Sequence, residues 1–88
     1  MEIKLLEQIR TITASNPDIR FYLFGSSLKE NVIQNDIDLL VIYKDRETPQ
    51  MVRDILDKTN LPIDTIFFTV EEELELGFIE EVKAREIL

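Results

Sequence analysis

The chain contains no cysteine and no histidine, and these absences narrow the chemistry open to it. Without cysteine it can form neither disulfides nor thiolate metal sites. Without histidine, any bound metal ion must be held by oxygen ligands, and no imidazole is present to act as a general base. A metal site in this protein would therefore be built from oxygen atoms.

Basic residues are also scarce. Ten Lys and Arg stand against 18 Asp and Glu, which gives a net charge of −8. Binding to a nucleic-acid backbone depends on basic side chains that release counterions, and the few here are scattered along the chain. The composition argues against strong direct nucleic-acid binding and instead suits a basic protein partner, because complementary charge speeds encounter.

Long apolar runs are missing as well. No run approaches the about 20 residues that a membrane helix needs, and no signal-peptide pattern opens the chain, so we expect a cytoplasmic protein without membrane contact. An apolar content of 44% and a charged content of 32% are typical of an ordinary globular protein. The 88 residues leave room for one core, and we predict a single domain over residues 1–88.

The hydrophobic pattern predicts several helices. The first covers residues 2–14, where apolar residues recur near helical spacing: Ile3, Leu6, Ile9 and Ile12. A second covers 48–58, with Thr48 as its cap and Pro49 in the first turn. A third begins near Thr69 or Val70, before three glutamates that favour a helix N-terminus. A short helix at 26–30 is also expected, with its N-terminal amides free for an anion.

Short apolar runs between these helices predict strands. We expect strands at 19–24, 37–43 and 63–69, and the strongly apolar second run indicates a central position in the sheet. The last residues, 85–88, are either helical or a short edge strand, and we favour the strand. The order predicts an α+β (mixed α/β) fold, with a small mixed sheet of three to four strands and helices mainly on one face.

Two aspartates at the start of the central run carry the strongest functional signal. Asp36 and Asp38 are two residues apart, so on a strand their side chains share a face at a spacing of roughly 7 Å. Like charges held this close repel unless a cation lies between them, and Mg²⁺ commonly uses one or two carboxylates with substrate phosphates. The Gly25-Ser26 turn adds backbone N–H groups that can approach phosphate oxygens. Together these residues indicate a metal-dependent nucleotide site.

This arrangement resembles the minimal nucleotidyltransferases of the DNA polymerase β superfamily. The resemblance rests on a Gly-Ser pair, a short spacer, and Asp-x-Asp in front of Leu39-Leu40-Val41. It implies that Asp36 and Asp38 are catalytic ligands of two Mg²⁺ ions. It also implies a third carboxylate on a later strand, and Asp64 stands where that residue is expected, to complete the catalytic metal and assist proton removal.

The same resemblance assigns the triphosphate contacts. Gly25 lets phosphate approach the backbone because it has no Cβ. Ser26 offers a hydroxyl and an amide to the β- or γ-phosphate, and Ser27 and Lys29 are further contacts in the same turn. The best-known small members are MntA-type antitoxins paired with HEPN-domain ribonuclease toxins. The implied activity is transfer of AMP from ATP, or of another nucleotide, onto a partner-protein hydroxyl, namely a tyrosine of the ribonuclease.

Departures from the family pattern keep a second hypothesis open. The spacer is one residue shorter than usual, Ser27 replaces a common arginine, and Glu30-Asn31 stands where a glycine is frequent. The chain is therefore alternatively an inactive binding module that neutralises its partner by occlusion, through a surface formed by Phe78, Ile79 and Val82. A stand-alone nucleotide-binding or drug-modifying fragment is a third hypothesis.

Each motif also has a structural explanation. A Gly-Ser pair after a strand is commonly only a turn, and an isolated Asp-x-Asp is commonly a solvated loop. Asp64 is alternatively a charge that protects an edge strand from aggregation. The three signals favour a functional site because they occur together and in the expected order.

Overall fold

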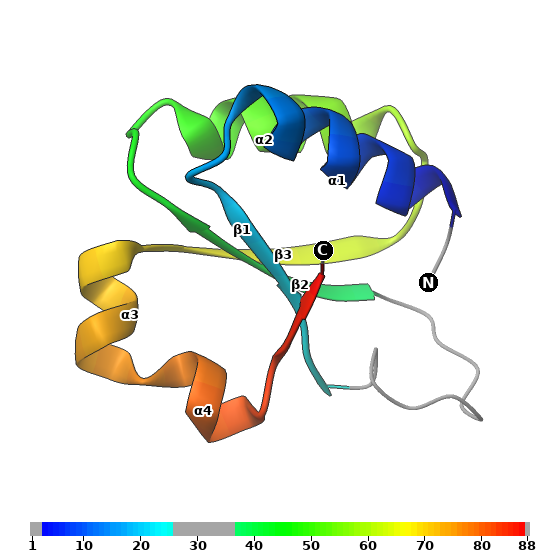
Figure 1. The fold of residues 1–88 in the computed structure, drawn as a ribbon. Coiled ribbons are helices and arrows are strands. Elements are labelled where there is room, and N and C mark those ends of the chain that lie inside the picture. Colours follow the sequence, from blue (N-terminus) through cyan, green and yellow to red (C-terminus); the bar gives the residue numbers. More distant parts are fainter. Residues whose placement is uncertain (1–2, 26–36, 88) are drawn as a thin grey trace.

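The computed structural model describes residues 3–25 and 37–87, which form a four-stranded sheet with helices on both sides (Figure 1). In these two ranges no helix is both long and apolar enough to cross a lipid bilayer. The elements follow in chain order: α1 (Ile3–Ser15), β1 (Arg20–Leu23), β2 (Ile37–Tyr43), α2 (Thr48–Asp57), β3 (Ile63–Thr69), α3 (Val70–Leu76), α4 (Phe78–Val82) and β4 (Arg85–Ile87).

The sheet is mixed, with strand order β3-β2-β1-β4. Strand β2 runs parallel to β3 and antiparallel to β1, and β4 pairs antiparallel with the other side of β1. The predicted α+β class and the central position of the 37–43 strand are confirmed. The C-terminal segment is the edge strand that we favoured, next to β1.

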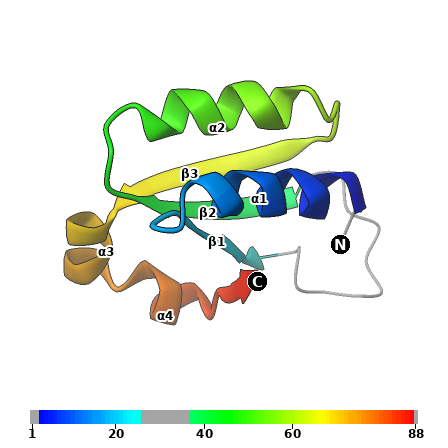
Figure 2. The ribbon, with the colours of Figure 1, turned by 45° about the horizontal axis from the view of Figure 1, so that its top comes forward.

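The main core lies between the sheet and the two longer helices, α1 and α2, which run side by side over one face (Figures 1 and 2). Strand residues alternate between faces, so one set of side chains from β1 and β2 points toward these helices. The buried cluster consists of Leu5, Ile9, Ile12, Ile19, Phe21, Leu39, Val41, Val52, Leu56 and Ile87.

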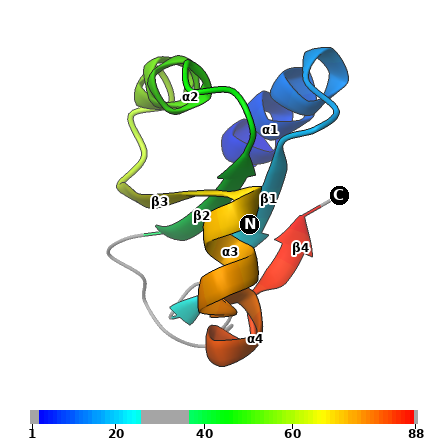
Figure 3. The same cartoon turned by 90° about the vertical axis from the view of Figure 1, so that its left-hand side faces the viewer.

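The opposite face is partly covered by the short helices α3 and α4 (Figure 3). Leu40 and Ile42 point to this side: they are buried but do not belong to the main cluster. The ring of Phe78 packs edge-to-face against Phe24 and Phe68, with centroids 5.3 and 5.4 Å apart. Such aromatic pairs contribute about 0.5–1.5 kcal/mol beyond their buried area, so these contacts help hold α4 against the sheet.

The predicted inward face of the first helix was partly wrong. Its buried residues are Leu5, Ile9 and Ile12, whereas Ile3 is 69% exposed and Leu6 only partly buried. Two residues correspond to a rotation of about 200° around a helix, so Ile3 lies nearly opposite Leu5. Ile9 and Ile12 follow Leu5 at intervals of four and three residues, which keeps all three on one stripe.

The predicted cap of the second helix was also wrong by one residue. Glu47 is the N-cap and makes no side-chain capping bond, while Thr48 is the first helical residue and is 6% exposed. The Thr48 N–H group donates to the backbone carbonyl of Asp45 at 3.0 Å. Thr48 therefore packs its side chain inward, and the proline in the first turn supplies the favourable helical geometry.

Helix α3 starts at Val70, where the glutamates of its first turn predict a start, and both of its ends are capped locally. Thr69 accepts a hydrogen bond from the Glu72 N–H at 3.1 Å, and Glu72 accepts one from the Thr69 N–H at 2.8 Å. Gly77 then ends the helix in the left-handed conformation. None of the residues of α3 is buried, so these caps substitute for core packing.

The two faces of α1 give a direct stability test. We expect Leu5→Ala to lower the free energy of unfolding by about 2–5 kcal/mol, because it removes a fully buried side chain. Ile3→Ala on the same helix should change it by less than about 0.5 kcal/mol. Chemical denaturation of both variants measures the difference, and equal losses would contradict the assigned core.

Candidate active site

Three strand ends meet at one edge of the sheet. Because β1 is antiparallel to β2, the end of β1 lies beside the start of β2, and the start of parallel β3 lies beyond it. The Phe24 N–H donates to the Asp38 carbonyl at 3.2 Å. The Ile37 N–H donates to the Pro62 carbonyl at 2.7 Å. These bonds fix the positions of Gly25, Asp38 and Asp64 relative to one another.

Asp38 and Asp64 are direct neighbours in the parallel register of β2 and β3. Residues paired in this way point to the same face of strands that are about 4.8 Å apart. Since Leu39 points into the core under α1 and α2, both aspartates face the opposite side. Asp38 is half-buried and Asp64 is exposed. The fold therefore brings two of the three predicted acids together.

Gly25 is the third predicted residue at this edge. Its φ is +59°, in the left-handed region that favours glycine. A Cβ atom at this position would lie 2.6 Å from Oδ2 of Asp38, closer than side-chain atoms are normally found. The conformation favours glycine, and a methyl group here would force the Asp38 carboxylate to move, because that carboxylate lies directly against the backbone of Gly25.

The other predicted site residues, Asp36, Ser26, Ser27 and Lys29, lie outside the described residues, as does the short helix expected at 26–30. Their roles stay predictions. Within the part of the chain that the structure describes, no group of three or more acidic side chains is arranged to hold a metal ion. The predicted ligand set includes Asp36, which that description does not reach.

An aromatic wall beside the site was not recognised from the sequence. Phe24 directly precedes Gly25 and packs against Phe78, which in turn packs against Phe68. Phe78 had been assigned to a partner-binding surface, but its ring is half-buried in this internal contact. The sequence did contain one signal for this aromatic contact. Phe24 lies next to Gly25 and on the same strand face as Tyr22.

One cation on this face of the sheet is paired with a carboxylate. Arg20 donates to Oε2 of Glu86 at 2.9 Å across β1 and β4, and this hydrogen bond raises the pKa of the guanidinium. Burial raises the pKa of the Tyr22 hydroxyl, and the negative charge of Glu86 raises it further. Arg20 lies at the end of β1 that is remote from Gly25, so its charge is paired away from the candidate site.

Comparison with known proteins adds to this geometry. A family model described as "Polymerase beta, Nucleotidyltransferase" matches residues 7–88. The chain belongs to the polymerase β nucleotidyltransferase family. The match includes all the predicted site residues and strands β1 to β4. No individually curated protein matches the chain.

The family assignment makes nucleotidyl transfer the general activity of this domain. The described site residues suit the Mg²⁺ and nucleotide that such an activity uses. Asp38 and Asp64 offer hard oxygen ligands on neighbouring strands, which is the ligand type that Mg²⁺ prefers. A side chain at position 25 would displace the Asp38 carboxylate, whereas glycine lets that carboxylate lie against the turn.

The two glycines of this nucleotidyltransferase provide a matched test of the site geometry. Both have φ of +59°, but a Cβ atom at Gly77 would meet nothing within 4 Å. We expect Gly77→Ala to lower the free energy of unfolding by about 1–2 kcal/mol through backbone strain alone. Gly25→Ala should lower it by a further about 0.5–1.5 kcal/mol, because its methyl group forces the Asp38 carboxylate out of its preferred rotamer. Equal losses in thermal or urea unfolding would show that Gly25 does not lie against the carboxylate.

Proposed function

We propose that the chain is a cytoplasmic, Mg²⁺-dependent nucleotidyltransferase that transfers AMP from ATP onto a hydroxyl group of a partner protein and releases pyrophosphate. The observation that carries the proposal is the pairing of Asp38 with Asp64, with the Gly25 backbone against the Asp38 carboxylate. In this proposal the two acids supply oxygen ligands for a cation, and the backbone of Gly25 is the point that a phosphate approaches. Both are needed when a nucleotide is moved from a triphosphate.

Each residue has a defined task in this proposal. Asp36, Asp38 and Asp64 bind two Mg²⁺ ions, which when bound stabilise the attacking and leaving oxygens of an in-line displacement. Gly25 positions the triphosphate through its backbone, together with Ser26, Ser27 and Lys29. Asp64 is the more exposed acid of the described pair, so it is the one best placed to accept the proton of an incoming hydroxyl.

A protein acceptor is supported by the surface of α3. Leu74 and Leu76 are 80% and 58% exposed, although leucine is normally buried. The segment from Val70 to Val82 contains glutamates but no basic residue. A rigid helix with exposed leucines among negative charges suits a partner with an apolar patch and a basic rim. This surface replaces the one predicted around Phe78.

The resemblance to MntA-type antitoxins identifies the partner in this proposal as a HEPN-domain ribonuclease. Modification of a tyrosine on that enzyme would silence it, and the chain would act as its antitoxin. Incubation of the two proteins with Mg²⁺ and labelled ATP should transfer label to the ribonuclease. A parallel reaction with each of the other nucleoside triphosphates identifies the preferred nucleotide.

Substitution of Asp38 and Asp64 tests whether this pair of carboxylates takes part in the transfer reaction. We expect Asp38→Asn and Asp64→Asn each to lower the rate of label transfer by at least about 100-fold, because loss of even an outer partner of a metal ligand costs about 10–100-fold. Asp45→Asn, just beyond the other end of β2, is the control and should retain the activity. Equal rates in all three variants would remove Asp38 and Asp64 from the chemistry.

A second candidate function is neutralisation by occlusion, which the exposed leucines of α3 also favour. Co-expression with the ribonuclease separates the two hypotheses. If the chain acts as an enzyme, Asp38→Asn abolishes protection of the cell. If it only covers its partner, Asp38→Asn protects as well as the unchanged chain, whereas Leu74→Ser weakens protection.

A further inference from the structure

Among residues 3–25 and 37–87, strand β3 has one backbone edge without a paired strand. It pairs with β2 on one side and lies at the end of the sheet. Its seven residues contain no lysine, proline or glycine, so Asp64 is its only residue of a kind with which proteins commonly blunt an exposed edge. The other edge strand, β4, has only three residues. The outer edge of β3 is therefore the longer of the two templates for pairing with a further strand.

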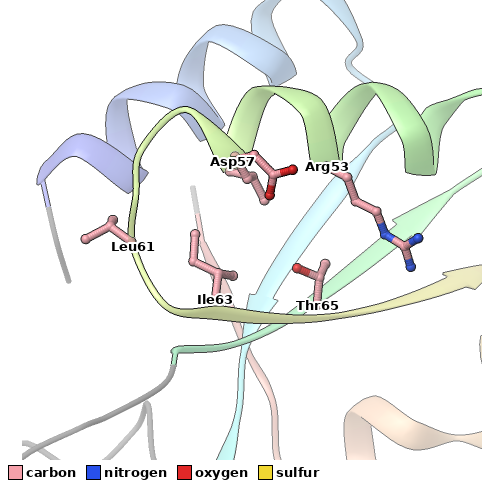
Figure 4. Close-up of a pocket in the computed structure, with 6 residues that line it drawn as sticks. Arg53, Asp57, Leu61, Ile63 and Thr65 are labelled. Atoms are coloured by element: carbon pink, nitrogen blue, oxygen red, sulfur yellow. The ribbon is translucent and has the colours of Figure 1, made fainter.

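A cavity of about 220 Å³ opens between α2 and β3, and two opposite charges flank it (Figure 4). The guanidinium of Arg53 lies 4.9 Å from the ring centroid of Phe67. The Asp57 side chain lies one helical turn further along α2, nearer to Ile63 (Figure 4). Neither residue takes part in the ion pairs found among the described residues.

We propose that this edge is the interface of a homodimer, in which β3 pairs antiparallel with β3 of a second copy. A twofold axis through Thr65 would place Ile63 opposite Phe67 of the other copy. Arg53 lies over the Phe67 end and Asp57 over the Ile63 end, so each Arg53 would face Asp57 of the second copy. The surface is complementary to itself, which is the requirement of a twofold interface.

The reciprocal charges favour a second copy over an unrelated strand. Any extended peptide could pair with the outer edge of β3. Only a second copy related by a twofold axis brings its Asp57 to Arg53 and its Arg53 to Asp57. The same register places Asp64 opposite Ile66, so the candidate active-site acids of the two copies do not face each other. The interface would also cover Leu61, a half-buried residue that lines the cavity. This inference does not depend on transferase activity.

Charge reversal tests the contact in solution. Sedimentation equilibrium at about 0.15 M salt, where charge repulsion is screened beyond about 8 Å, should show a monomer–dimer equilibrium. Arg53→Asp and Asp57→Arg should each raise the dimer Kd by at least about 10-fold, and the double variant should restore it. Arg10→Asp on α1 changes the net charge as much as Arg53→Asp and should leave the dimer intact.

The absence of cysteine allows a separate test of the register. Thr65→Cys would place two thiols opposite each other across the axis, at a Cα separation of about 4.5–5.5 Å that suits a disulfide. Mild oxidation should give a cross-linked dimer, whereas Ile63→Cys on the same strand should stay monomeric under denaturing electrophoresis. A monomer at every concentration, a double charge variant that does not recover, or equal cross-linking of both cysteine variants would overturn the proposal.

Discussion

The site depends on the parallel register between β2 and β3, which places Asp38 directly beside Asp64. Like charges opposite each other on neighbouring strands lower stability by a few tenths to about 1 kcal/mol. The register holds because Leu39 and Val41 complete the core, and a slip by one residue would turn the charged side chain of Asp38 toward that core. Burial of apolar side chains thus holds the two acids in place without a need for attraction between them. Two acids held together in this way can offer oxygen ligands to a cation.

Strand β2 contributes side chains to both faces of the sheet, and the two faces have different roles. Leu39 and Val41 complete the core under α1 and α2, while Asp38, Leu40 and Ile42 face the other side. On that second side the short helices are held by local caps and by the ring of Phe78, rather than by a deep core. Phe24 connects this aromatic contact to Gly25, and its N–H bonds to the backbone of Asp38. The packing of α4 and the geometry of the candidate site are therefore coupled through one residue.

Local signals in the sequence were enough to predict β2, β3 and the start of α3, because apolar runs and a cluster of glutamates at a helix N-terminus depend only on neighbouring residues. Side-chain direction was less accessible. Ile3 was predicted to face the core because Ile3, Leu6 and Ile9 also recur at helical intervals. The sequence alone does not favour the stripe that starts at Leu5 over this one. Thr48 was assigned as a cap because its burial depends on tertiary packing. The contact of Phe78 with Phe24 joins distant parts of the chain, and no local pattern encodes it. Asp64 was placed beside Asp38 only through the family resemblance, since strand register between separate runs is a tertiary property.

The central claim is that Asp38, beside Asp64 and Gly25, forms a site that binds a nucleotide together with Mg²⁺. Isothermal titration of ATP into the unchanged chain and into Asp38→Asn, each with Mg²⁺ and with a chelator, tests it most directly. We expect heat of binding from the unchanged chain in Mg²⁺, loss of that heat in the chelator, and an affinity at least about 10-fold weaker for the variant. ATP binding of equal strength in the chelator, or of equal strength by Asp38→Asn, would contradict the account.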